Sequence, residues 1–138
     1  MTELARKIRE GNRRQLDDFK RLVAGEHDVS ALREFADSHW QEDEISIPVY
    51  KRVLELNPED DKAWSYLGLV KLLIGEDAEA VQCLERARKI NPDGIEVLTL
   101  QAALEKRRDE QLKIYKKMLE QDPTNRVALA NLARLQNE

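Results

Sequence analysis

An asparagine or aspartate followed by proline closes three similar stretches of this 138-residue chain. The dipeptides are Asn57-Pro58, Asn91-Pro92 and Asp122-Pro123, and their prolines lie 34 and then 31 residues apart. A period in this range indicates one supersecondary unit that is copied and stacked along the chain. A stack of small units presents one extended surface rather than a deep pocket.

The clearest unit runs from Asp61 to Gly94. Apolar residues recur at helical spacing over residues 60–74, which predicts a helix with a broad apolar face. Gly75 ends this helix, because glycine tolerates the left-handed conformation of a helix C-cap. Glu76 then begins a second helix, where an acidic group complements the helix dipole, and Pro92 stops that helix. The short connection at Gly75 leaves the two helices antiparallel.

This unit resembles the tetratricopeptide repeat, whose pattern is W-x2-L-G-x2-Y, then A-x3-F, then P. Lys71 stands where the tyrosine of that pattern is expected, and Leu84 replaces the phenylalanine. The small residues Gly68 and Ala80 let the paired helices approach closely. An ordinary helical hairpin with the same spacing is the alternative interpretation. The positions that match the pattern are Trp64, Leu67, Gly68, Ala80, Ala87 and Pro92.

Two weaker copies flank the clear unit. After Pro92, residues 97–104 and 112–119 predict a helix pair that is three residues short, with the deletion expected around residues 106–109. A final helix after Pro123 has no predicted partner and is expected to act as a cap.

The first copy lies before Pro58. Residues 47–54 predict its second helix, with Pro48 in the first turn, where the missing amide donor is not needed. Its first helix is expected at about residues 29–40. The predicted fold is therefore all-α, a short α-solenoid of about three antiparallel helix pairs, with a C-terminal capping helix and an N-terminal helix.

The predicted division of the chain is an N-terminal amphipathic arm, residues 1–28, followed by a repeat domain, residues 29–138. Seven basic and five acidic residues give residues 1–26 a net charge of +2, which leaves −6 for the rest. We expect the apolar stripe of the arm to dock on the first repeat, with an interruption of the helix at Gly11-Asn12. A basic arm for a protein, anionic lipid or nucleic acid, and partial disorder, are the alternatives. The stripe consists of Leu4, Ile8, Leu16, Phe19, Leu22 and Val23.

The residues that carry most enzyme and metal chemistry are scattered. His27, His39 and Cys83 show no metal-ligand spacing, and a single cysteine forms no internal disulfide. Cys83 lies on the second helix of the clear unit, where a small core residue is a better interpretation than a nucleophile. We therefore expect no enzyme activity, no metal and no cofactor.

The net charge and the apolar stretches of the sequence limit the kinds of partner that we expect. The net charge is −4 at pH 7 and the pI is about 5.4, so the sequence does not predict nucleic-acid binding. The longest apolar stretch, Leu72-Leu73-Ile74, is far shorter than a membrane span, so no membrane insertion is expected. We expect a cytoplasmic protein, either complete or a domain of a larger one.

In tetratricopeptide proteins the first helix of each repeat lines the concave surface, which is the usual peptide-binding groove. The resemblance therefore implies a groove that is more apolar than charged. Chaperone-binding members use lysine and asparagine side chains to clamp a C-terminal carboxylate. This chain has Ser65 and Leu69 at two such positions, so that clamp is not expected. The asparagine ladder of the glycosyltransferase-associated repeats is not expected either, because only Asn131 would fit it. The implied groove residues are Lys62, Ser65, Leu69, Leu72, Leu98, Ala102, Glu105, Ala130 and Arg134.

The function that this resemblance implies is a scaffold or adaptor whose groove binds an amphipathic helix or an extended apolar peptide of a protein partner. Two alternatives stay open. One is a self-associating assembly protein, a homo-oligomer in which an end or the arm fills the groove of a neighbour. The other is the regulatory domain of a larger enzyme.

Overall fold

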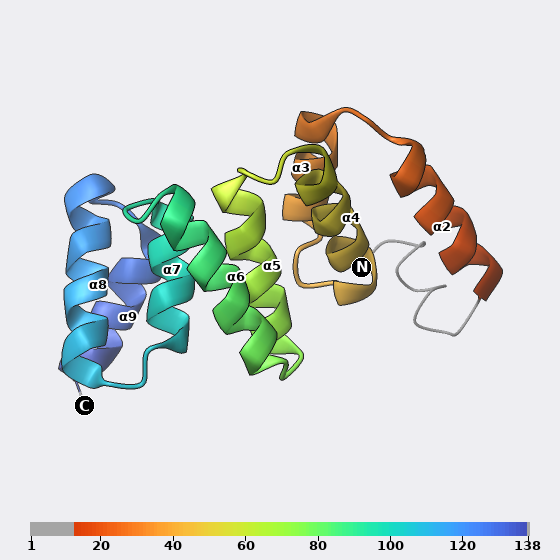
Figure 1. The fold of residues 1–138 in the computed structure, drawn as a ribbon. Helices are drawn as coiled ribbons and strands as arrows, with labels where there is room; N and C mark the ends of the chain where they lie inside the picture. Colours follow the sequence, from red (N-terminus) through yellow and green to blue (C-terminus); the bar gives the residue numbers. More distant parts are fainter. Residues whose placement is uncertain (1–12, 138) are drawn as a thin grey trace.

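The computed structural model describes residues 13–137, and every regular element in that range is an α-helix (Figure 1). This confirms the all-α prediction. The helices are α2 (Arg13–Gly25), α3 (Val29–Ser38), α4 (Asp43–Leu56), α5 (Asp61–Leu73), α6 (Asp77–Ile90), α7 (Ile95–Leu104), α8 (Arg108–Gln121) and α9 (Arg126–Gln136).

The helices pack as a linear stack. The pairs α3–α4, α5–α6 and α7–α8 form three successive hairpins, and α9 packs on α8 at the C-terminal end. Adjacent hairpins meet through α4 with α5 and through α5 and α6 with α7. In Figure 1 the stack runs from α2 at one end to α8 and α9 at the other. The three helix pairs and the single C-terminal helix confirm the predicted α-solenoid.

Side-chain caps and one glycine set the helix ends. The carboxylates of Asp28 and Asp60 and the amide oxygen of Asn125 each accept a hydrogen bond from the backbone amide three residues later, at 3.0–3.1 Å. Gly75 has a φ of 83°, as its predicted C-cap role requires. Its amide donates to Leu72, and the next amide donates to Lys71, which together form a Schellman motif.

Two boundaries refine the sequence-based expectations. Helix α4 begins at Asp43, so Pro48 lies inside the helix and not in its first turn. There it lacks the amide that would bond to the carbonyl four residues earlier. Helix α7 has 10 residues where α5 has 13, so the three-residue deletion shortens the end of α7. The carboxylate of Glu105 then accepts hydrogen bonds from the next two backbone amides and closes the turn.

The core consists of two clusters of buried side chains that meet in α7. Val97 and Leu100 belong to the larger cluster, which extends from α2 through α6. Leu98 and Ala102 belong to the smaller cluster, which α7 shares with α8 and α9. Helix α7 therefore joins the two halves of the stack.

Gly68 of α5 lies where three helices approach most closely. A Cβ atom placed on Gly68 would lie 2.4 Å from Cδ2 and 3.2 Å from Cδ1 of Leu100 in α7. The same atom would lie 3.1 Å from Cβ of Cys83 in α6. The absence of a side chain at this position lets α5 contact α6 and α7 directly, as the repeat pattern predicts.

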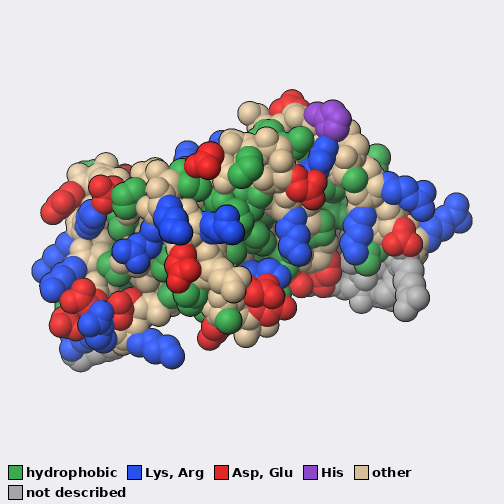
Figure 2. All heavy atoms as spheres, in the orientation of Figure 1, with side chains coloured by type: hydrophobic (Ala, Val, Ile, Leu, Met, Phe, Trp, Pro, Cys, Tyr) green, Lys and Arg blue, Asp and Glu red, His purple; other side chains and the backbone are tan. Residues whose placement is uncertain are grey.

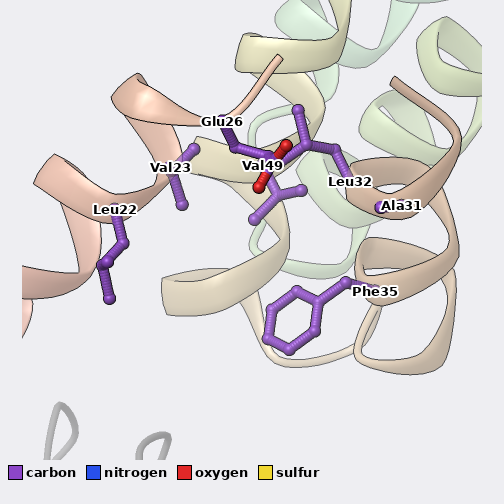
Figure 3. A pocket seen from close by; sticks show the side chains of 7 residues that line it. All are labelled: Leu22, Val23, Glu26, Ala31, Leu32, Phe35 and Val49. Atoms are coloured by element: carbon purple, nitrogen blue, oxygen red, sulfur yellow. The ribbon is translucent and has the colours of Figure 1, made fainter. Parts of the chain in front are cut away.

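The described part of the N-terminal arm, α2, docks on the first repeat. Phe19 and Val23 are buried, Leu16 packs against the same core, and the rings of Phe19 and Phe35 lie 6.4 Å apart. In Figure 3, Val23 lies beside Val49 of α4. These contacts agree with the expected docking, whereas the domain boundary at residue 28 stays a prediction.

Leu22 departs from the expected stripe. It is 74% exposed, and it lines the open side of a cavity of about 200 Å³ between α2 and the first repeat, together with Leu32 and Val49 (Figure 3). The other expected contacts of the stripe, Leu4 and Ile8, and the interruption at Gly11-Asn12 lie outside the described residues.

We predict that Gly68→Ala lowers the free energy of unfolding by about 1–3 kcal/mol, because the added methyl group overpacks a full core. Leu100 is fully buried, and both of its terminal carbons lie near the new atom, so a rotamer change gives no relief. Urea denaturation measures the change. Gly25→Ala is the matched control, since nothing lies within 4 Å of the atom it adds. Equal stabilities of the two variants would contradict the close approach at Gly68.

The docking of α2 predicts a contrast between two of its apolar residues. Phe19→Ala should destabilise the protein by about 3 kcal/mol, because it empties a buried site. Leu22→Ala should change the stability by less than about 0.5 kcal/mol, as is usual for an exposed position. Thermal melts of both variants decide. If Phe19→Ala leaves the melt unchanged, then α2 does not cap the stack, and the alternative of a basic arm for an anionic partner gains support.

Candidate protein-binding groove

A cavity of about 730 Å³ lies along the first helices of the repeats. Helices α5, α7 and α9 supply most of its lining, α8 adds two residues, and one comes from the turn after α3. We call this cavity the groove. Its lining residues are Trp40, Tyr66, Leu69, Ile95, Glu96, Thr99, Ala102, Ala103, Gln111, Tyr115, Asn125, Val127, Asn131 and Arg134.

Helical periodicity explains which residues line the groove. The lining positions of α9 are Val127, Asn131 and Arg134, at intervals of four and three residues, and therefore share one face. Helix α7 presents Ile95 and Thr99 in the same way. Because α5, α7 and α9 lie in successive layers of the stack, their faces together form one continuous wall.

One end of the groove is aromatic. The rings of Trp40 and Tyr66 lie 6.3 Å apart, and Tyr66 stacks on Tyr50 at 5.9 Å with an angle of 3° between the ring planes. The hydroxyl group of Tyr50 donates a hydrogen bond of 2.7 Å to Asp37. Burial and this hydrogen bond raise the pKa of Tyr50 well above its usual range, so its hydroxyl stays protonated and remains a donor.

The other end of the groove carries amide groups and a guanidinium group. Gln111 donates through Nε2 to the backbone carbonyl of Glu105 at 2.6 Å, which fixes the side chain at the end of α7. Asn131 donates to the carbonyl of Val127 at 2.7 Å and accepts a 3.3 Å hydrogen bond from Arg134. These bonds hold the polar side chains in place, and the carbonyl oxygen of Gln111 remains available as an acceptor.

The structure brings only three of the predicted groove residues into the lining, namely Leu69, Ala102 and Arg134. Lys62, Leu72, Glu105 and Ala130 lie outside it. Whether any of these residues contacts a partner stays a prediction.

Ser65 and Leu98 are core residues, and their expected place in the groove is wrong. Ser65 is fully buried and donates a hydrogen bond of 2.8 Å to the backbone carbonyl of Asp61. Leu98 is 2% exposed and belongs to the cluster shared with α8 and α9. At these two positions the residue that lines the groove is the next one along the helix, Tyr66 in α5 and Thr99 in α7.

Sequence reasoning missed most of the lining. Trp40 falls at the end of the helix expected at residues 29–40 and lies in the turn after it. Gln111 and Tyr115 lie on α8, the second helix of its repeat, whereas the resemblance places groove residues on first helices only. Tyr66 and Thr99 each lie one position after the predicted Ser65 and Leu98. The polar side chain of Thr99 could have been chosen over the apolar Leu98, whereas no such signal separates Tyr66 from Ser65.

Lys71, which replaces the family tyrosine, lies away from the groove. Its side chain is largely buried, and its Nζ atom lies 2.8 Å from carboxylate oxygens of both Glu76 and Glu79. Burial by itself would lower the pKa of Lys71, but the two carboxylates outweigh it and raise that pKa. The lysine therefore joins the end of α5 to the start of α6 through ion pairs.

The described residues provide no group of three or more histidine, cysteine, aspartate or glutamate side chains placed to hold a metal ion. His39 pairs instead with Glu42 at 2.8 Å, and His27 lies 2.8 Å from Arg52. No described helix is long and apolar enough to cross a membrane. On the face drawn in Figure 2, basic and acidic side chains are interspersed along the molecule.

Cys83 is predicted to be unreactive in the folded protein. Burial raises the pKa of its thiol to about 11, and the thiolate is the reactive form. At pH 8 a thiol reagent should therefore modify Cys83 only as fast as the protein unfolds. Stability from the neutral thiol is present below pH 9 and is lost as the pH rises toward 11, so Cys83→Ala should lose less stability over that interval. Rapid modification without urea would instead indicate an accessible, activated thiol.

Comparison with known proteins agrees with this architecture. The tetratricopeptide repeat family model matches residues 46–104, and no curated protein matches the chain. Among 41 similar solved chains is a mutant form of MamA, with a TM-score of 0.58 and 21% sequence identity. The alignment covers 86% of this chain and 92% of that one, so the two share a fold. Residues 46–104 are therefore similar to the tetratricopeptide repeat, and the stacked helix pairs on both sides of them continue the same architecture.

Proposed function

We propose that this protein is a scaffold or adaptor that holds a segment of another protein in the groove. The observation that carries the proposal is the cavity of about 730 Å³, which side chains of four helices line with both apolar and polar groups. Cavities of this size, with apolar walls and a few placed polar groups, are where proteins usually bind their ligands. The similarity of residues 46–104 to a family of protein-interaction modules supports the same proposal.

The lining suits a peptide better than a catalytic substrate. Leu69, Ile95 and Val127 offer apolar surface to the side chains of a helix or an extended segment. Gln111 and Asn131 carry amide groups that bond either to side chains or to an exposed backbone. An amphipathic helix or an extended apolar peptide would use both kinds of group at once.

Self-association is a second candidate, which the C-terminal end of the stack favours. Leu129 and Ala133 of α9 occupy the repeat positions of Trp64 and Gly68, and no described residue covers either of them fully, so both are exposed. A neighbouring copy could cover this face. Light scattering over a range of concentrations separates the two candidates, because only self-association raises the mean mass. The third alternative, a regulatory domain of a larger enzyme, stays a prediction.

Filling the groove should abolish partner binding. Ala103 is exposed and lines the groove, so Ala103→Arg places a long side chain in the ligand's path without disturbing the core. The immobilised chain captures its partners from a lysate, and mass spectrometry identifies them. We expect the Ala103→Arg variant to lose these proteins. Calorimetry with an identified partner should then show that the variant binds it at least tenfold more weakly.

Ala78→Arg is the matched control for this experiment. The substitution is the same, and Ala78 of α6 is also exposed, but it lies outside both the groove lining and the exposed face of α9. Circular dichroism should show both variants folded. Equal capture by Ala103→Arg and the original chain would place the partner elsewhere on the molecule.

A further inference from the structure

The aromatic end of the groove also carries negative charge. Glu96 lies in the first turn of α7 and lines the groove together with Trp40 and Tyr66. Asp37 of α3 lies beside the same aromatic group, because it accepts the hydrogen bond of Tyr50, on which Tyr66 stacks. Glu96 therefore shares the groove lining with Trp40 and Tyr66, and Asp37 lies behind them at the hydroxyl group of Tyr50.

No cation of the described chain neutralises these carboxylates. Glu96 is half-buried and forms no hydrogen bond or ion pair with a described residue. Asp37 accepts its hydrogen bond from a neutral hydroxyl group and forms no ion pair with a described residue. The dipole of α7 favours a carboxylate at Glu96, but no described cation pairs with it, so a cationic ligand group would be attracted here.

The electrostatic influence on Tyr66 supports this arrangement. Burial and the negative charges of Asp37 and Glu96 raise the pKa of Tyr66, so its hydroxyl group stays protonated beside the groove. Arg33 opposes them, but its guanidinium group is bonded at 3.1 Å to the buried carboxylate of Asp60. Arg33 is therefore engaged by another acid and does not pair with Asp37 or Glu96.

We propose that this end of the groove, lined by Trp40, Tyr66 and Glu96, binds a lysine or arginine side chain of the partner segment. The cation would lie over an aromatic face and beside a carboxylate, which is the arrangement in which both kinds of attraction act together. The apolar side chains of Leu69 and Ile95 line the groove as well, so the basic residue should stand next to an apolar one in the ligand. This inference rests on the proposed function and specifies the chemistry of its ligand.

A random peptide library displayed on phage and selected on the immobilised full chain tests the proposal. Peptides that bind the chain but not the Ala103→Arg variant depend on the groove. We expect these peptides to carry a lysine or arginine, and replacement of that residue by norleucine, which keeps the length but removes the charge, should weaken binding about tenfold.

The protein side is tested with Glu96→Gln, which keeps the shape of the side chain but removes its charge. The basic peptide should lose about tenfold in affinity for this variant, and the norleucine peptide should lose nothing further, so that the two changes form a coupled cycle. Glu85→Gln, at an exposed carboxylate of α6 outside the groove lining, is the matched control and should bind like the original chain. Thermal melts should be the same for both variants.

The possible results separate this inference from the proposed function. Groove-dependent peptides without a basic residue, or equal affinity for Glu96→Gln and Glu85→Gln, would overturn the inference and leave the groove as a binding site. Peptides that all tolerate Ala103→Arg would overturn the proposed function, and the inference would fall with it. A second copy seated in the groove, detected as concentration-dependent mass in light scattering, would overturn the assignment to a peptide partner.

Discussion

The close contact of α5 with α6 and α7 at Gly68 is the constraint on which the rest of the structure depends. Leu100 of α7 occupies the space that a side chain at position 68 would fill, and Cys83 of α6 lies on the other side. This contact fixes the distance between the second and third repeats. The position of α7 then determines both the wall of the groove and the docking of α8 and α9, because α7 contributes to both core clusters.

A stack in which each repeat contacts only its neighbours has a direct consequence for binding. Stability in such stacks is approximately a sum of repeat and interface contributions, so the groove is rigid only where adjacent repeats are firmly joined. The aromatic end rests on the larger cluster, since Tyr66 and Trp40 pack against it. The amide end belongs to α8 and α9, which rest on the smaller cluster. A ligand that spans the groove would therefore contact both halves and hold them together.

Local signals in the sequence were sufficient to predict the helix pairs. Gly75 and the residues before the prolines end helices through their own backbone preferences, and Asp28 and Asp60 cap helices through their own side chains. None of these effects depends on distant residues. The small residue at Gly68 is likewise part of a repeat pattern that can be read directly from the sequence.

The face that each helix presents to the groove was harder to predict. Helix α7, with the sequence IEVLTLQAAL, is apolar on nearly every side, so periodicity alone does not separate Leu98, which is buried between helices, from Thr99, which lines the groove. That distinction arises only when α8 and α9 cover one side of α7.

If the wall formed by α5, α7 and α9 is the binding surface, a selected peptide should perturb the residues of that wall. Nuclear magnetic resonance spectra of the backbone amides, recorded while the peptide is added, measure this perturbation. The largest chemical-shift changes should occur at groove residues such as Tyr66, Thr99 and Asn131, while Gln82 and Glu85 of α6 stay unchanged. Changes concentrated on α6, without changes at the groove residues, would show that the peptide binds elsewhere.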